Sequence, residues 1–331
     1  MSKRLILLLP LLGFSLFGCS LPAVETQTPE ELPALTGTPF QPELVTPLPE
    51  LILATLLPES TATLSPDLSF EQLRNAEYTT TGLNNGIPST YRMQDGSYRT
   101  GTDSAVAGYA TIDLLSTHAF GDLDNDTRLD AVVLLVENYG GTGQFVQIAT
   151  VLNRDGQPVH SASYFLGDRV AVSNIIIQNN EIILTAQVHG PQDGLCCPSV
   201  PASIHLRLLK ENQLMLTHFT TRAPSGQERA INIRAPLSGA EASGAITIIG
   251  DITIAPFENN LSYTVYDSEY REISRSYLMV DAPDFGAPGT FALTIDLASL
   301  GHTGDIYIEI TDLSAADGSV LALSQIQLKV R

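Results

Sequence analysis

Four carboxylates are concentrated in one short segment, which reads Gly-Asp-Leu-Asp-Asn-Asp-Thr-Arg-Leu-Asp over residues 121–130. Loop positions 1, 3, 5 and 9 are Asp122, Asp124, Asp126 and Asp130, and position 7 would contribute the carbonyl of Arg128. Oxygen ligands at these offsets can surround one Ca²⁺ ion, which takes about 6–8 oxygens. Without a cation, the clustered carboxylates would repel one another. We therefore expect a calcium site, with an acidic, solvated turn between strands as the alternative.

The spacing resembles the calcium loops of EF-hand proteins and, more closely, the strand-flanked calcium loops of integrin-type β-propeller repeats. Two positions depart from the EF-hand pattern: Thr127 replaces the glycine of the sharp turn, and Val133 replaces the bidentate glutamate. The valine-rich run that follows Asp130 predicts a strand, which excludes a helix–loop–helix unit.

The only adjacent cysteines are Cys196 and Cys197, followed by a proline. Neighbouring Cα atoms lie about 3.8 Å apart, below the usual disulfide range of about 4.4–6.8 Å. A vicinal disulfide would therefore be strained, but it is favoured because the pair has no other intrachain partner. Metal ligation is the alternative, with His189 as the one histidine nearby in the sequence.

The N-terminus has the pattern of an export signal. Lys3 and Arg4 precede a short apolar run from Leu5 to Phe17 that ends at Gly18-Cys19. This run is shorter than the roughly 20 residues of a membrane-spanning helix. The ending resembles the lipobox of bacterial lipoproteins, with Phe17 at a place where a small residue is usual. The resemblance implies that residues 1–18 are removed and that Cys19 is lipidated and anchors the chain to a membrane.

The next segment, residues 19–67, contains nine prolines and no lysine or arginine. Proline at this density opposes both helices and sheet ladders, so we expect a disordered, Pro/Thr-rich tether.

Two mostly β domains should follow, over residues 68–222 and 229–331. For the first we expect an α+β domain with a mainly antiparallel sheet, because the connections are too short for helical crossovers. Ser69 and Gln72 have capping-box spacing for a short helix over residues 69–76. Residues 91–99 predict a hairpin that turns at Asp95-Gly96. Further strands are predicted at residues 107–115, 131–137, 144–152, 170–177, 181–188 and 202–209. Between them, residues 153–156 predict a turn, Asn179-Asn180 closes a second hairpin, and the glycine-rich segment 140–143 predicts a hairpin connection.

The second domain has short runs of β pattern separated by Gly, Pro and Asp-Gly, about seven in about 100 residues, which suits an immunoglobulin-like β-sandwich. The predicted strands are 231–233, 245–255, 261–266, 291–296, 305–310 and 321–330.

Both domains resemble domains of exported bacterial proteins. The first resembles an uncharacterised domain of exported lipoproteins through the segments 75–78, 121–124, 166–169 and 190–198, and that group implies no activity. The second resembles the immunoglobulin-like domain of bacterial spore-germination (Gmad) proteins. The matching residues lie at 235–239, Gly250, 256–261, 289–291 and 317–319. This resemblance implies an envelope-associated sandwich that is not an enzyme.

The charge restricts the partners of the chain. Its 36 acidic and 17 basic residues give a formal net charge of −19, which opposes binding to nucleic acid. The six histidines are scattered outside zinc-type motifs, and no Gly-x-Ser-x-Gly elbow is present. We therefore expect a non-enzymatic lipoprotein that binds an envelope protein or a glycan. The alternatives are an accessory subunit of an envelope complex and a hydrolase with unrecognised machinery.

Overall fold

The computed structural model describes residues 66–82, 86–210 and 212–331. The chain divides into two units, residues 1–61 and 62–331, and all described residues belong to the second. The predicted signal segment, Cys19 and the tether as far as residue 65 lie outside the described residues. No helix among the residues described here has the length and apolarity needed to cross a membrane.

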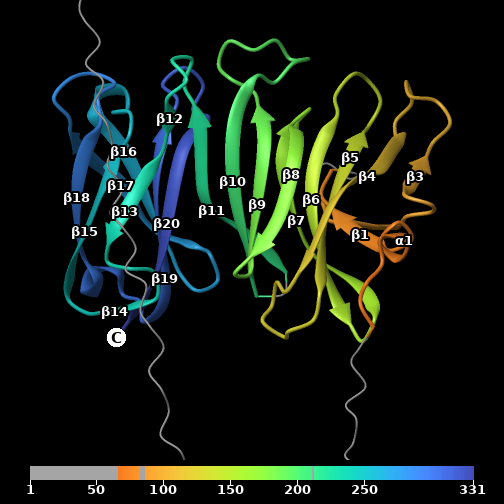
Figure 1. The fold of residues 1–331 in the computed structure, drawn as a ribbon, viewed down its shortest axis with the longest axis horizontal. Coiled ribbons are helices and arrows are strands. Elements are labelled where there is room, and N and C mark those ends of the chain that lie inside the picture. Colours follow the sequence, from red (N-terminus) through yellow and green to blue (C-terminus); the bar gives the residue numbers. More distant parts are fainter. Residues whose placement is uncertain (1–65, 83–85, 211) are drawn as a thin grey trace, which may run out of the picture. The chain divides into compact units, whose positions relative to one another are not determined.

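The fold is mostly β and antiparallel, as predicted (Figure 1). The first domain begins with α1 (Phe70–Leu73), in which Ser69 and Gln72 form the predicted capping box. This helix is shorter than the predicted 69–76, because the chain leaves it through tighter bonds, such as that from the Ala76 amide to the Leu73 carbonyl. A two-stranded sheet follows, formed by β1 (Glu77–Thr80) and β2 (Ser89–Arg92).

The central sheet of the first domain has five strands in the order β3-β4-β5-β6-β7. Their bounds are Ser97–Thr100, Ala110–Gly121, Asp130–Asn138, Phe145–Arg154 and Gln157–Asp168. Strand β5 is buried on both faces, which explains its unbroken run of apolar side chains. The glycine-rich segment 140–143 connects β5 to β6, and Asp155-Gly156 turns β6 into β7, both as predicted.

The hairpin predicted over residues 91–99 is confirmed at its Asp95-Gly96 turn, where Gln94 and Ser97 exchange backbone hydrogen bonds, but its two strands do not pair with each other. Strand β2 pairs with β1, and β3 pairs with β4. A single bridge between Gln94 and Ser97 remains around the Asp95-Gly96 turn. The two strands separate because Tyr91 packs in the core beneath α1, whereas β3 extends the edge of the five-stranded sheet.

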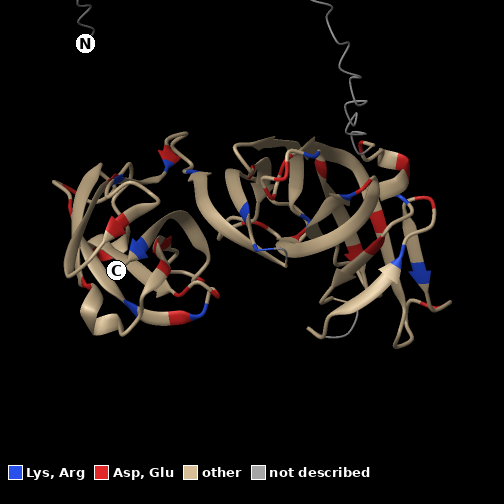
Figure 2. Cartoon of the chain, turned by 90° about the horizontal axis from the view of Figure 1, so that it is seen from below, with Lys and Arg blue, Asp and Glu red and all other residues tan. Residues whose placement is uncertain are grey.

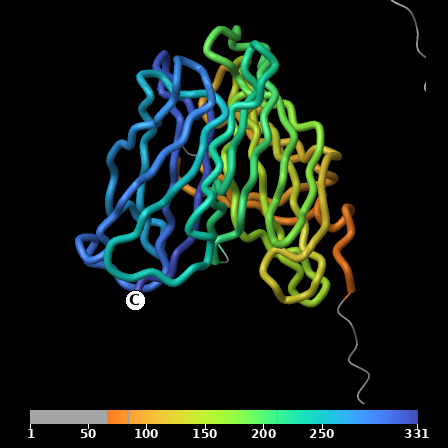
Figure 3. Tube along the Cα trace, turned by 60° about the vertical axis from the view of Figure 1, so that its left-hand side comes forward, coloured from red at the N-terminus to blue at the C-terminus, as the bar shows by residue number. Residues whose placement is uncertain are grey.

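A second sheet of the first domain covers the opposite face of β5 and β6. It contains β8 (Ala171–Gln178), β9 (Glu181–Val188), β10 (Val200–Leu209) and β11 (Gln213–Arg222), which appear in green in Figure 3. Apolar residues of both sheets meet in one core, for example Leu134 of β5, Leu184 of β9 and Leu206 of β10. Asn179-Asn180 forms the predicted turn between β8 and β9, with both residues at positive φ.

The second domain is a β-sandwich over one further core. One side has the order β13-β15-β18, and the other β17-β16-β19-β20. In chain order the strands are β12 (Glu228–Arg229), β13 (Ile231–Ala235), β14 (Ala240–Ala242), β15 (Ala245–Ile252), β16 (Asn260–Tyr266), β17 (Glu272–Asp281), β18 (Gly289–Asp296), β19 (Gly304–Leu313) and β20 (Val320–Val330). Two short 3₁₀ helices, Phe257–Asn259 and Leu297–Leu300, lie between strands.

The two domains share a continuous sheet, because β11 pairs with β20 through His218↔Ser324 and Phe219↔Leu323. The Thr221 hydroxyl donates to the Leu321 carbonyl at 2.6 Å beside this pairing. Lys210 and Glu269 form an ion pair between the β10–β11 turn and the second domain. These contacts attach the second domain to the first at residues 218–221 of β11 and at the β10–β11 turn.

Candidate functional site

The acidic loop joins two neighbouring strands of the five-stranded sheet. Strand β4 ends at Gly121, β5 begins at Asp130, and these two residues are partners in the ladder. The two ends of the loop therefore lie side by side at the edge of the sheet, because the pairing of β4 with β5 places Gly121 opposite Asp130. This geometry brings Asp122 and Asp130 together although they are loop positions 1 and 9.

Asp130 is the buried base of the loop. Its side chain is fully buried, and its carboxylate accepts hydrogen bonds from the Leu123 amide at 2.9 Å and the Asn153 amide at 2.8 Å. Burial raises the pKa of Asp130 to about 6, although the two amides lower it, and Asp124 and Asp126 raise it further. A buried carboxylate of this kind has a higher energy when ionised, and a bound cation would offset that cost.

The exposed part of the loop is built on the other carboxylates. Asp122 accepts from the amides of Asn125 at 2.7 Å and Thr127 at 2.9 Å. Asn125 and Thr127 have φ values of 66° and 69°. Thr127 thus adopts the left-handed conformation that glycine usually supplies at this position. The sharp turn forms without the glycine that was missing from the pattern.

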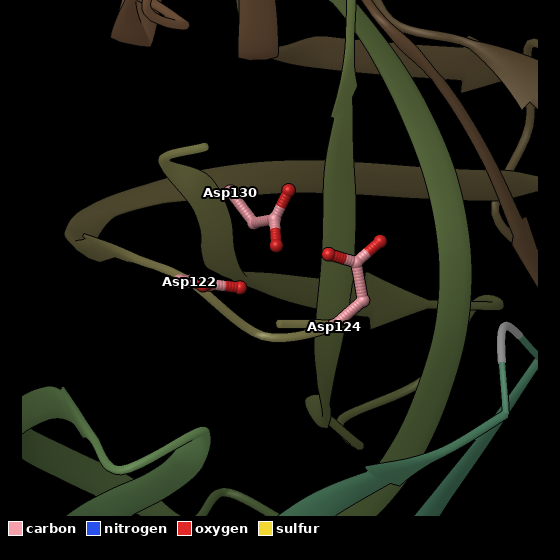
Figure 4. A group of neighbouring side chains, drawn as sticks. All are labelled: Asp122, Asp124 and Asp130. Carbon is pink, nitrogen blue, oxygen red and sulfur yellow. The ribbon is translucent and has the colours of Figure 1, made fainter. Parts of the chain in front are cut away.

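Three of the predicted ligands converge. Carboxylate oxygens of Asp122, Asp124 and Asp130 all lie within 4.8 Å of one another, and Figure 4 shows the three side chains directed toward a common space. Hard cations such as Ca²⁺ prefer an all-oxygen environment of this type. These residues fit such an ion by donor chemistry and by convergence.

Asp126 lies outside this group of three and is held by two arginines. Arg154 at the end of β6 donates to Asp124 at 2.8 Å and to Asp126 at 3.4 Å. The Arg128 side chain also lies near Asp126, with Nε 3.8 Å from its carboxylate. The arginine charges offset part of the carboxylate repulsion and would compete with a cation.

Sequence reasoning missed the parts of the site that come from β6. Segment 153–156 was interpreted only as a turn, yet the Asn153 amide binds Asp130 and the Arg154 guanidinium binds Asp124. The pairing of β5 with β6 brings them there. The one available signal in the sequence was Arg154, which lies just before the predicted Asp155-Gly156 turn. An arginine in that position does not by itself indicate a bond to the acidic loop.

Cys196 and Cys197 are joined by a disulfide in the loop between β9 and β10. Asp193 organises this loop by accepting from the amides of Gly190 and Ser199, both at 2.8 Å. These hydrogen bonds lower the pKa of Asp193, with that from Gly190 contributing most. Both cysteines are exposed, so the disulfide faces solvent rather than a core.

Two serine–histidine pairs among the described residues bear on the possibility of catalysis. In the first, His205 Nε2 lies 3.2 Å from the Ser203 hydroxyl, and His205 Nδ1 lies 3.2 Å from the Glu181 carboxylate. The second pair is His160 and Ser163. His160 Nε2 lies 2.9 Å from the Ser163 hydroxyl, which donates its proton to the Thr79 carbonyl at 3.0 Å. His160 Nε2 must then be the donor to Ser163, so it does not act as a base toward that hydroxyl. Burial also lowers the pKa of His160 to about 4. This arrangement differs from that of an activated nucleophile, in which the histidine accepts the serine proton.

Acidic residues lie on both domains, with basic residues interspersed (Figure 2). Their excess agrees with the net charge of −19.

Comparison with known proteins identifies the second domain. Residues 230–319 match the family model described as the immunoglobulin-like domain of bacterial spore germination, Gmad2. No curated protein matches the chain. The match covers β13 to β19 and ends just before β20. The sandwich at the C-terminal end of this chain is therefore a Gmad2-type immunoglobulin-like domain.

Proposed function

We propose that the chain is a non-enzymatic lipoprotein, anchored through Cys19, that presents two β domains outside the cytoplasmic membrane to bind an envelope protein or a glycan. The observation that supports this most is the pairing of β11 with β20. It makes one continuous sheet from both domains, so residues of both can form a single, stable binding surface. The Gmad2 match supports an extracytoplasmic setting, because it relates the second domain to bacterial germination proteins.

The anchor is tested by metabolic labelling with palmitate. The full chain should incorporate label and fractionate with membranes, and Cys19→Ser should abolish both. Cys196→Ser is the matched control, since it also removes one cysteine and should leave labelling unchanged. A Cys19→Ser protein that still carries label or stays membrane-bound would refute lipidation at this residue.

We also propose that Asp122, Asp124 and Asp130 bind Ca²⁺, with Asp126 and the Arg128 carbonyl completing the predicted set. The convergence of three carboxylates supports this proposal. When bound, the ion would supply positive charge that stabilises the ionised form of Asp130 and fixes the loop. Isothermal titration of the full chain with Ca²⁺ should give a saturable signal, and no heat at millimolar calcium would refute it.

The binding function is tested by crosslinking in intact cells, followed by capture of the full chain with calcium present or chelated. A specific envelope protein or glycan, recovered in stoichiometric amount and still bound by the purified chain, would support the proposal. An accessory role is the second candidate. It is favoured if the captured material is a multi-subunit complex that binds this chain when intact, while its separate subunits do not. Turnover of a captured glycan by the purified chain would instead favour the hydrolase alternative.

A further inference from the structure

A cavity of about 460 Å³ lies where the sheet of the first domain meets the Gmad2-type domain. Strands β9, β10 and β11 supply one wall, and β19, β20 and the segment before β14 supply the other. Its volume falls within the range of about 300–1,000 Å³ typical of small-ligand sites, which often form at domain boundaries. We call it the interdomain cavity.

The first-domain wall carries a carboxylate held in a fixed position. Glu181 accepts a hydrogen bond from the Thr217 hydroxyl at 2.6 Å, and His205 Nδ1 lies 3.2 Å from its other oxygen. Arg207 approaches Glu181 at 3.9 Å, too far for a hydrogen bond. His218 packs edge-on against His205, with ring centroids 5.2 Å apart.

The second-domain wall combines two side-chain amides with one buried aromatic ring, that of Tyr307. Gln325, Gln327 and Tyr307 line the cavity. Gln325 donates to the Tyr270 hydroxyl at 3.0 Å, and the Tyr307 ring packs edge-on against Tyr270 at 6.0 Å. Tyr270 in turn stacks on Tyr266, with centroids 4.3 Å apart and planes within 16°. A row of three tyrosines therefore leads away from the cavity, with Tyr266 and Tyr270 half-buried.

Several polar groups of the cavity keep unused hydrogen-bonding capacity. No side chain or backbone group among the described residues makes a hydrogen bond to the side chains of Arg207, His218 or Gln327. Gln327 is held through its backbone amide, which donates to the Ser238 hydroxyl at 3.1 Å, and this leaves its side-chain amide available. Donors and acceptors are thus presented together from both walls.

The charge of the cavity distinguishes it from the rest of the chain. Among the described residues, Glu181 and Arg207 are the only ones lining the cavity with a formal charge when the histidines are neutral, and these two charges cancel. An anion would be repelled by a chain of net charge −19, and a cation would find a carboxylate already bound to Thr217 and His205. A neutral ligand that both donates and accepts hydrogen bonds suits this lining best.

We propose that the interdomain cavity binds a neutral oligosaccharide. Sugar hydroxyls donate and accept, so Arg207, His218 and Gln327, whose side chains have no other hydrogen-bond partner among the described residues, can each bind one. The inference rests on the proposed binding function and specifies its ligand class. Because both domains line the cavity, neither domain alone would hold the sugar.

The test is calorimetric titration of the full chain, purified in mild detergent, with neutral trisaccharides of glucose and of N-acetylglucosamine. Arg207→Ala and Gln327→Ala should each weaken binding about tenfold, the effect of losing roughly 1.4 kcal/mol of hydrogen bonding to the ligand. Gln187→Ala is the matched control, since this exposed residue lies on β9 outside the cavity and its replacement should leave affinity unchanged.

Tyrosine fluorescence provides a second measurement on the unsubstituted chain, which contains no tryptophan. Neutral sugar should change the emission with the same affinity as the calorimetric signal. The proposal is overturned if no neutral trisaccharide binds, if an acidic trisaccharide such as trigalacturonate binds more tightly, or if both cavity variants, verified as folded, bind normally. An envelope protein captured by crosslinking alongside a negative sugar titration would refute this inference and leave the broader binding function standing.

Discussion

Arg229 donates to Asp312 at 2.5 Å and thereby ties the segment that links the two domains to strand β19 of the second. The Asp312 side chain is fully buried, and the Arg229 side chain is one-fifth exposed. Burial raises the pKa of Asp312, and the guanidinium of Arg229 partly offsets that rise. The ion pair thus neutralises a carboxylate that the fold has removed from water.

We expect Arg229→Ala to destabilise the chain by about 3–5 kcal/mol, because it leaves a buried carboxylate without its partner. Urea denaturation of the two proteins measures the difference. Arg331→Ala serves as the control, since its ion pair with Glu241 is largely exposed and should contribute about 1 kcal/mol or less. Equal effects of the two substitutions would contradict the structural role of the buried pair.

Arg154 should limit the affinity of the acidic loop for calcium. It holds Asp124 and Asp126 with a positive charge that a cation must displace. Arg154→Ala is therefore expected to tighten calcium binding severalfold, whereas Asp130→Asn should abolish it. Asp95→Asn, in an exposed turn, is the control for loss of one carboxylate. Weaker calcium binding by the Arg154 variant would mean that the arginine supports the site.

Protons should compete with calcium at Asp130. The pKa of this residue in the folded chain is raised to about 6, chiefly by burial. A cation requires the ionised carboxylate, so affinity should be nearly constant above about pH 7 and should fall as pH drops through 6. Calorimetry at pH 7.5, 6 and 5 measures this dependence. An affinity independent of pH over this range would exclude Asp130 as a ligand.

Thr127 tests the conformation of the loop separately from its charge. Its φ of 69° is strained for a β-branched residue and comfortable for glycine. Thr127→Gly should raise the free energy of unfolding by about 1 kcal/mol, because the strain removed exceeds the added entropy of the unfolded chain. Thr127→Ala, which retains a Cβ, should gain less. Thermal unfolding in chelator compares them, and a less stable glycine variant would contradict the assigned conformation.

His160 should make the fold sensitive to mild acid. Burial lowers its pKa to about 4, from 6.5 for an unperturbed histidine. The unfolded chain then binds the proton more tightly, so the contribution of His160 to stability is complete above pH 6.5 and is lost as pH falls toward 4. The loss should reach about 2–3 kcal/mol relative to His160→Gln. Urea denaturation of the unsubstituted chain and of His160→Gln at pH 7.5 and 4.5 measures this loss. Equal changes in the free energy of unfolding of the two proteins between these pH values would refute it.

Local patterns in the sequence predicted the features that depend on neighbouring residues. The capping box at Ser69 and Gln72, the turn at Asn179-Asn180 and most strands of both domains follow from such patterns. Strands β7 and β11 were missed because burial along both is irregular, and Pro158 lies near the start of β7. Strand β17 was missed because it alternates only weakly, with several exposed residues in succession.

Contacts between residues far apart in the sequence could not be predicted from the sequence alone. Arg154 reaches Asp124 across 30 residues because β5 and β6 are paired, and no local pattern encodes that contact. The pairing of β11 with β20 likewise joins segments about 100 residues apart. The interdomain cavity follows from it, so scattered residues such as His205 and His218 could not be grouped before the sheet was known.

The shared sheet also bears on how the two domains behave when separated. Strand β20 lies between β19 and β11, and β11 lies between β10 and β20, so each shields part of the other's edge. Cutting the chain between Arg222 and Glu228 would leave two strands with unpaired backbone amides and carbonyls, the kind of edge that recruits other strands and aggregates. The attachment of the Gmad2-type domain thus protects the solubility of both halves, and a shortened protein meant for study should keep residues 66–331 intact.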